Sequence, residues 1–353
     1  MRLKSYVGHR VRELALYPQI MARSGSPKVL FFPWSGPEGF SLLRVYNIAE
    51  GLAAKGWKTL VVPKQLELSQ RARVVRLFDP DILVFQKCRH PLNDADHAFG
   101  KPFVLDLDDA DWFDDALHDR MVRTVSVARG VIAGSDFVAD WCGQYNPDTT
   151  VIWTGAPVTD AGEHHTDHAD RAPILTWAQA DPLGYMAELE LVRDFLRRLR
   201  EAGAEFTFRL YGVQSDKYAE ELRRQFDMGP LELVPPLSYD RFCRSLQEVA
   251  IGLSPIIPQS DFSRGKSFGK ILAYLDAKVP VISSDEADHA RFFEGDAGLV
   301  SNDLDQWVSY ARDLLSDPVR RERVAGNAFR LFRQKLSLST ATNHVADFLQ
   351  ARL

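Results

Sequence analysis

Short apolar runs alternate with amphipathic segments along most of the chain. In the first half, apolar runs predict strands at residues 28–32, 59–63, 81–86, 102–107, 130–135 and 150–155. Residues 41–56 carry apolar side chains at helical spacing and end at Gly56, the residue type that most often ends a helix. Strands that are apolar on both faces and separated by helices predict a parallel sheet covered on both sides.

The alternation restarts after a polar segment without periodicity at residues 158–172, where His164, His165 and His168 are expected to be solvated. Further strands are expected at 173–178, 206–212, 231–236, 251–257 and 279–284. Helices are expected at 186–203, 217–228 and 239–250, after Ser267, and over 303–335 and 338–352. A second parallel sheet follows from this order.

The predicted fold class is therefore α/β, with two doubly wound, Rossmann-like domains. The predicted division is a basic N-terminal segment (1–26), a first domain (27–157), a linker (158–172), a second domain (173–335) and a C-terminal helix (336–353) that returns to the first domain. Ligands of such sheets bind beyond the carboxyl ends of the strands, so the active site is expected in a cleft between the domains.

Composition excludes several classes of protein. The 353 residues carry a net charge of -5, which gives no general attraction for nucleic acid. The three cysteines, Cys88, Cys142 and Cys243, are too few and too widely spaced for a disulfide framework or a metal site. A reducing, cytoplasmic compartment is expected.

The first 26 residues are basic and contain no apolar core of the length that a signal peptide needs. No later stretch has the ~18 apolar residues of a membrane span, so a soluble protein is expected. The segment either packs on its own domain or lies as an interfacial helix on anionic lipid at the inner face of a membrane. Both outcomes stay open at this point.

The stretch DFSRGKSFGKILAYLDAKVPVISSD, residues 261–285, places cations at the start of an expected helix. With Ser267 as the N-cap, Lys266 and Lys270 lie at the end of the helix that already carries positive charge. An anion such as phosphate, held by the backbone N–H groups and these side chains, would explain the arrangement. A solvated turn is the alternative.

Acidic residues follow the strand at 102–107 in the run DLDDADWFDD. Asp106, Asp108 and Asp109 should project at the carboxyl end of this strand. Near the end of the first strand, Gly36 and Gly39 would allow a ligand to approach the backbone, although their spacing is not that of a dinucleotide-binding loop. Ser41 and Arg44 follow on the first helical turns and are expected either to face the ligand or to lie on the surface.

Three motifs and the C-terminal helix together resemble the glycosyltransferases of GT-B fold, in particular the retaining family 4 group. They are IGLSPIIPQSDFSRGKSFGKILAYLDAKVPVISSD, PFVLDLDDADWFDD, VIAGSDFVADWCGQYNPDTTVIWTGAPV and the final SLSTATNHVADFLQARL. The resemblance implies transfer of a sugar from a nucleoside-diphosphate donor to a glycan or lipid-linked acceptor. It also implies retention of configuration, with no bound metal and no cofactor besides the donor.

The resemblance implies roles for particular residues. The donor diphosphate would contact Lys266, Ser267 and Lys270, with the backbone of Arg264 and Gly265. The rest of the donor pocket would come from Trp177, Gly212, Val234 and Pro235. On the acceptor side, Asp108 and Asp109 would act on acceptor hydroxyls or on the reacting sugar, with Gly36, Gly39, Ser41 and Arg44 nearby.

The sequence departs from the family at two positions. Gly265 and Ala273 stand where the family often has glutamates, which leaves open altered donor binding or a non-catalytic sugar-binding protein. A second alternative is a Mg²⁺-dependent phosphatase of haloacid dehalogenase type, with Asp106 as nucleophile and Asp108 as acid/base. Against it, Ala110 replaces the usual residue after the motif, and the second domain would be unexplained.

Overall fold

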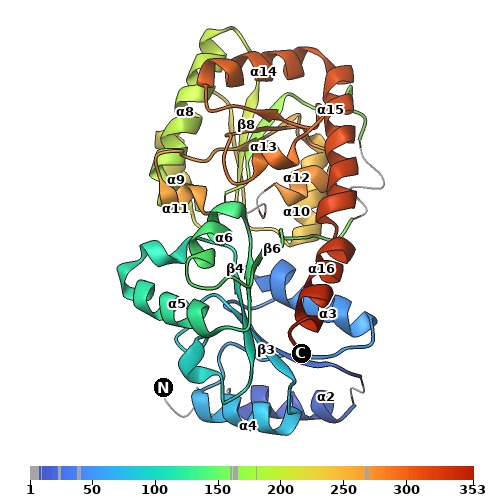
Figure 1. Cartoon of the computed structure of the whole chain (residues 1–353). Coiled ribbons are helices and arrows are strands. Elements are labelled where there is room, and N and C mark those ends of the chain that lie inside the picture. The colour runs from blue at the N-terminus through green and yellow to red at the C-terminus, as the bar shows by residue number, and fades with distance from the viewer. Residues whose placement is uncertain are drawn as a thin grey trace. The chain divides into compact units, whose positions relative to one another are not determined.

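The computed structural model describes residues 8, 10–22, 25–37, 41–159, 161, 166–179, 181–266, 269 and 271–353. The chain forms two compact units: unit 1 is Met1–Ala156, Gly265–Ser267 and Leu338–Leu353, and unit 2 is Pro157–Arg264 and Phe268–Ser337. Each unit contains a six-stranded parallel sheet with helices (Figure 1). The predicted α/β class with two Rossmann-like domains is confirmed.

The sheet of unit 1 has the strand order β2-β1-β3-β4-β5-β6. Its strands are β1 (Lys28–Phe32), β2 (Lys58–Val61), β3 (Ile82–Gln86), β4 (Phe103–Leu107), β5 (Val131–Ala133) and β6 (Thr149–Val151). Every pairing is parallel, and Gln86 at the end of β3 is in register with Asp106 on β4. The carboxyl ends of β1, β3 and β4 therefore meet at one edge of the sheet.

Helices cover both faces of this sheet because alternate strand residues are buried on opposite sides. Leu30 and Phe32 join one apolar cluster with residues of α4 (Leu68–Phe78), α5 (Asp115–Val127) and α6 (Asp136–Gly143). Val29 and Phe31 join another, with residues of α3 (Asn47–Ala54) and α16 (Leu338–Gln350), and these two helices lie side by side in Figure 1.

The N-terminal segment packs on unit 1. Leu16 and Ile20, the latter on α2 (Tyr17–Ala22), are buried in the cluster that contains α4. The Glu13 carboxylate is fully buried and accepts hydrogen bonds from Arg73 Nε at 2.7 Å and from Gln70 Nε2 at 3.0 Å. These contacts lower the pKa of Glu13 to about 2, against the opposing effect of burial. A buried carboxylate with several donors fixes this segment to α4.

The sheet of unit 2 has the order β12-β11-β10-β7-β8-β9, again entirely parallel. Its strands are β7 (Ile174–Trp177), β8 (Thr207–Tyr211), β9 (Leu231–Val234), β10 (Ile251–Ser254), β11 (Val281–Ser283) and β12 (Leu299–Val300). The helices are α8 (Met186–Glu201), α9 (Asp216–Gln225), α10 (Tyr239–Ser245), α11 (Asp261–Arg264), α12 (Leu272–Asp276), α13 (His289–Phe292), α14 (Leu304–Ser316) and α15 (Pro318–Leu331).

Several predicted elements differ in detail. The helix expected over 303–335 is two helices, because Pro318 starts a new one and the Asp317 side chain caps it by accepting from Arg320 N at 2.9 Å. Strand β12 was not predicted, since two residues are too short for a pattern. The first helix expected over 41–56 begins with a π-helical turn, Leu42–Tyr46, before α3.

The expectation that His168 is solvated is wrong, whereas His164 and His165 lie outside the described residues. His168 is fully buried in unit 2, and its ring nitrogen Nε2 lies 3.0 Å from the carbonyl oxygen of Lys278. Arg171, also buried, donates to the carbonyl oxygens of Val249 and Ala277 at 3.1 Å each. Polar side chains of this segment thus hold it against unit 2 by bonding to backbone carbonyl oxygens. Contacts of this kind leave no hydrophobic periodicity in the sequence, so the pattern could not predict them.

Candidate functional site

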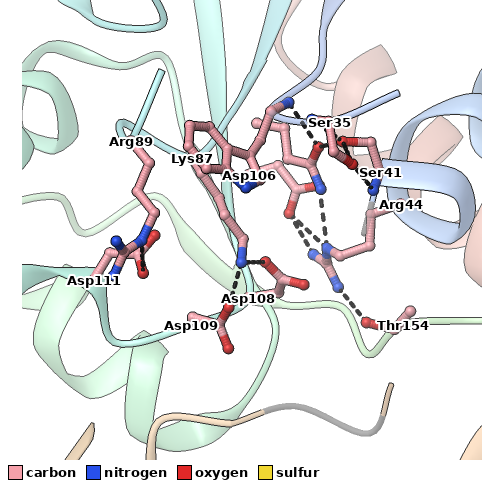
Figure 2. Close-up of polar contacts among 12 residues, drawn as sticks. Ser35, Ser41, Arg44, Lys87, Arg89, Asp106, Asp108, Asp109, Asp111 and Thr154 are labelled. Atoms are coloured by element: carbon pink, nitrogen blue, oxygen red, sulfur yellow. Dashed lines mark hydrogen bonds and ion pairs between the residues drawn. The ribbon is translucent and has the colours of Figure 1, made fainter. Parts of the chain in front are cut away.

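Polar side chains from four segments of unit 1 converge where β1, β3 and β4 end (Figure 2). The side chains are those of Ser35, Ser41, Arg44, Gln86, Lys87, Arg89, Asp106, Asp108, Asp109, Asp111 and Thr154. The predicted aspartates are among them, and so are Ser41 and Arg44. These side chains meet because β1, β3 and β4 are neighbours in the sheet.

Arg44 is buried and holds the Asp106 carboxylate. Its Nε lies 2.9 and 3.2 Å from the two carboxylate oxygens, and its Nη1 donates to the carbonyl oxygen of Ile152 and to Thr154 Oγ1 at 3.1 and 3.0 Å. Burial opposes the charge of Arg44, but the carboxylates of Asp106 and Asp108 outweigh it, so the pKa of Arg44 is raised. Arg44 therefore lies inside unit 1, and the possibility that it is a surface residue is wrong.

Gln86 connects the Arg44 helix to the turn after β1. Its Oε1 accepts from Ser41 Oγ at 2.5 Å and from the backbone N–H of Trp34 at 3.1 Å, and Ser41 Oγ in turn accepts from the backbone N–H of Ser35 at 2.8 Å. Gly36 belongs to this turn, whereas Gly39 lies outside the described residues. The amide nitrogen of Gln86 is buried without a hydrogen-bond partner among the described residues.

Lys87 lies between Asp108 and Asp109. Its Nζ is 3.0 Å from Asp108 Oδ1 and forms a second ion pair with Asp109 Oδ2. The residue is 4% exposed and has a positive φ of 55°, which is uncommon for a residue other than glycine. Burial opposes its charge, but Asp108 and Asp109 raise the pKa of Lys87 above its usual value. Burial alone would raise the pKa of Asp108, but the charges of Lys87 and Arg44 outweigh this effect and lower it.

The cluster continues along the acidic run. Arg89 Nε donates to Asp111 Oδ1 at 2.7 Å, and burial raises the pKa of Asp111. Trp112 stacks on Trp141 of α6, with ring centres 4.4 Å apart and planes at 2°. The adjacent ring of Phe113 is 44% exposed. The loop is thus anchored by one buried tryptophan, and it carries an exposed aromatic ring as well as carboxylates.

This arrangement bears on the phosphatase alternative. A carboxylate nucleophile needs an oxygen that is free to attack, whereas both oxygens of Asp106 accept from the buried Arg44. Asp108 and Asp109 are more accessible, since their side chains are 15% and 30% exposed. Carboxylates in this position can accept hydrogen bonds from hydroxyl groups. Among the described residues, no three His, Cys, Asp or Glu side chains are grouped so that they could hold a metal ion.

The predicted diphosphate site in the basic loop is only partly described. Ser267 and Lys270 lie outside the described residues, and Lys266 is 6% exposed. Helix α12 covers Leu272–Asp276, and the predicted N-cap residue Ser267 lies outside the described residues. The guanidinium of Arg264 is paired with Glu286, at 3.0 Å, and with Asp261.

The predicted donor-pocket residues lie at carboxyl ends of strands in unit 2. Trp177 ends β7 and is buried in the apolar core, Gly212 follows β8 with a φ of 83°, and Val234 ends β9 just before the exposed Pro235. Ala273 is buried. Its neighbour Tyr274 is fully buried, and the Tyr274 hydroxyl accepts from Ala178 N at 2.5 Å and donates to the carbonyl oxygen of Thr176.

Lys87 and Gln86 were not predicted. The signal was present, because two polar residues follow directly on the apolar run of β3, as the aspartates follow β4. Its interpretation requires the strand order, which places β3 beside β4.

Comparison with known proteins agrees with this architecture. Residues 189–351 match the family model described as glycosyl transferase-like. The structure is similar to the Anabaena protein HepE in complex with UDP-glucose (TM-score 0.68, 15% identity, covering 92% of this chain and 99% of that one).

Two further solved structures have the same fold. Sucrose-phosphate synthase from Thermosynechococcus elongatus has a TM-score of 0.69 at 12% identity, covering 92% of this chain and 99% of that one. A glycosyltransferase from Rickettsia africae has a TM-score of 0.65 at 13% identity, covering 93% and 99%. No curated protein sequence matches the chain. The expected resemblance to GT-B glycosyltransferases is confirmed, and the chain has the GT-B fold.

Proposed function

We propose that this chain, with its GT-B fold and its glycosyl transferase-like match over residues 189–351, is a glycosyltransferase that uses a nucleoside-diphosphate sugar. The observation that carries the proposal is that the family match covers most of unit 2, the side that binds the donor in this fold. The acceptor is a glycan or a lipid-linked sugar, and transfer proceeds with retention and without a bound metal.

Each unit has a separate task in this proposal. Lys266, Ser267 and Lys270, with the backbone of Arg264 and Gly265, bind the diphosphate, and positive charge there stabilises the leaving group. The pocket residues Trp177, Gly212, Val234 and Pro235 surround the rest of the donor. In unit 1, Asp108 and Asp109 bind the acceptor or the reacting sugar.

The first experiment is a thermal-shift series of the purified chain with UDP, GDP, dTDP, CDP and ADP, each with and without Mg²⁺. A ligand at a hundredfold excess over its Kd stabilises the folded chain by about 2.7 kcal/mol. We expect a shift with one diphosphate that is independent of Mg²⁺, and UDP is the first choice because the similar HepE structure contains UDP-glucose. No shift with any of them would contradict the proposal.

The N-terminal segment supplies a further part of the proposal, which is contact with an anionic membrane surface. Val11, Leu14 and Met21 are 60%, 56% and 84% exposed, and the exposed Arg10 and Arg12 lie beside them. Exposed apolar side chains in a segment that also carries exposed arginines suit an interfacial segment and a lipid-linked acceptor. Among the described residues, no helix is long and apolar enough to cross a bilayer. Flotation with anionic vesicles, compared with neutral ones and with Leu14→Glu, tests the contact.

A further inference from the structure

We propose that the acceptor presents an uncharged, hydroxyl-bearing sugar ring to unit 1. We infer that Lys87 is the positioning residue that holds Asp108 and Asp109 ready to accept hydrogen bonds from that ring. The inference rests on the proposed function and adds the substrate class and a further residue of the site.

The charge of the cluster argues against an anionic group at this place. Three cations, those of Arg44, Lys87 and Arg89, lie among five carboxylates, those of Asp106, Asp108, Asp109, Asp111 and Asp114. Each cation is already paired within the cluster. Among the described residues of this cluster, carboxylates outnumber cations, so a phosphate or carboxylate on the acceptor would meet net negative charge there, whereas a neutral hydroxyl donates to a carboxylate at no such cost.

The surroundings of the aspartates suit a sugar ring. The side chain of Asp109 is 30% exposed, so its carboxylate can accept from a ligand, whereas Asp108 is 15% exposed and its Oδ1 is buried beside Lys87. A few residues further along the same loop, Phe113 exposes a large part of its ring. Sugars have one apolar face and an edge of hydroxyl groups, so a loop that carries both an exposed aromatic ring and carboxylates suits such a ligand.

Gln86 gives an independent indication of a polar ligand or an ordered water. It is fully buried and its neighbour is Lys87, yet its amide nitrogen has no hydrogen-bond partner among the described residues. Its orientation is fixed, since Oε1 must accept from Trp34 N–H. A buried donor without a partner is costly, and an oxygen atom brought to the site would satisfy it.

Lys87 links this geometry to the aspartates. Its backbone N–H donates to the carbonyl oxygen of Asp106 at 3.0 Å, and its φ of 55° turns the chain at the end of β3. The buried ammonium then contacts both Asp108 and Asp109. One cation between two carboxylates offsets their mutual repulsion and fixes their spacing. Lys87 therefore determines the position of Asp108 and Asp109, which contact the substrate, without contacting the substrate itself.

The test compares Lys87→Gln and Lys87→Arg with Lys101→Gln, a matched control in unit 1 whose ammonium pairs with Asp79 on the surface. The full chain is assayed with the diphosphate sugar that the thermal-shift series identifies. The acceptor probes are neutral methyl glycosides of glucose, galactose, mannose and N-acetylglucosamine, and their 6-phosphates. Transfer is followed by release of the nucleoside diphosphate.

We expect the neutral glycosides to be accepted in preference to their phosphates. Lys87→Gln should lower kcat/KM for the acceptor at least tenfold, leave the Kd of the nucleoside diphosphate within twofold, and move the acid limb of the pH–rate profile to higher pH. The limb moves because Asp108, which faces Lys87, Arg44 and Asp106, loses the cation that lowers its pKa most. Lys87→Arg should restore part of the activity, and Lys101→Gln should leave it unchanged.

Two results would overturn the inference: a preference for the phosphorylated probes, or Lys87→Gln behaving like Lys101→Gln. If Lys87→Gln does not fold, Lys87→Arg and the pH profile of Asp109→Asn carry the test. The proposed function fails separately, if the wild-type chain neither binds a nucleoside diphosphate nor releases one from any diphosphate sugar.

Discussion

Arg44 and Asp106, which are 62 residues apart in sequence, form a buried ion pair, with Arg44 Nε 2.9 Å from Asp106 Oδ1. The pair joins the first helical turns after β1 to the end of β4. The same guanidinium bonds to the chain just after β6 through Ile152 and Thr154. One side chain thus connects three segments at the edge of the sheet where the candidate site lies.

Removal of one partner of this pair should destabilise unit 1. Arg44→Met leaves the Asp106 carboxylate buried without its donor, and breaking a buried pair in this way costs about 3–5 kcal/mol. Arg44→Met with Asp106→Leu replaces both charges by apolar side chains, so its free energy of unfolding should lie closer to that of the wild type. Urea unfolding followed by tryptophan fluorescence measures both. Equal losses in the single and double variants would contradict the assignment.

Substitution of Asp109 should separate the two tasks of the site. Asp109→Asn removes a carboxylate acceptor in unit 1 and leaves unit 2 untouched. We expect the affinity for the nucleoside diphosphate to stay the same while transfer falls roughly 10- to 150-fold, the equivalent of about 1.5–3 kcal/mol for a hydrogen bond to a charged group. Calorimetry and the transfer assay give the two values, with Asp79→Asn on the surface as the control. A parallel loss of binding would mean that the acidic loop is structural.

Lys270→Ala should weaken donor binding by about 1.5–3 kcal/mol, the range for a charge-assisted contact. The prediction follows from the GT-B resemblance, since Lys270 itself lies outside the described residues. Titration of the nucleoside diphosphate by calorimetry checks it, and Lys217→Ala on the exposed side of α9 serves as the control. Unchanged affinity in Lys270→Ala would remove this lysine from the diphosphate site.

The fold was largely predictable because its strands are buried on both faces. In β1, Val29 and Leu30 pack into different clusters, so a continuous apolar run marks a central parallel strand. Elements without such a pattern were missed or misplaced. Strand β12 is two residues long, and α12 has only five residues, beginning at Leu272.

The acidic residues of the site were predictable because they follow a single strand. Asp108 and Asp109 follow β4 directly, so the sequence places them at its carboxyl end. Lys87 follows β3, and its contact with them depends on β3 and β4 being neighbours. Local sequence patterns predict strands but not their order in the sheet. For the same reason the pairing of Arg44 with Asp106, which decides what Arg44 does, was not visible from the sequence.

His289 should make the stability of unit 2 depend on pH. The ring is fully buried, with Nδ1 3.1 Å from the carbonyl oxygen of Ser284, and burial lowers its pKa from 6.5 to about 4, although that carbonyl opposes the shift. The folded chain therefore keeps His289 neutral, whereas the unfolded chain binds a proton near pH 6.5. The contribution of His289 to the free energy of unfolding is complete above pH 6.5. It is lost as the pH falls toward 4, at up to about 1.4 kcal/mol per pH unit.

We expect the wild-type free energy of unfolding to fall by about 2 kcal/mol from this residue alone between pH 7 and 5, because each pKa unit corresponds to about 1.4 kcal/mol. His289→Asn keeps a donor for Ser284 but does not titrate there. The variant should be less stable than the wild type at pH 7 and should depend less on pH below it. His344→Asn, at an exposed position on α16, is the control. Urea titrations at pH 7, 6 and 5 measure the three slopes; the same slope in wild type and His289→Asn would show that His289 is protonated in the folded chain.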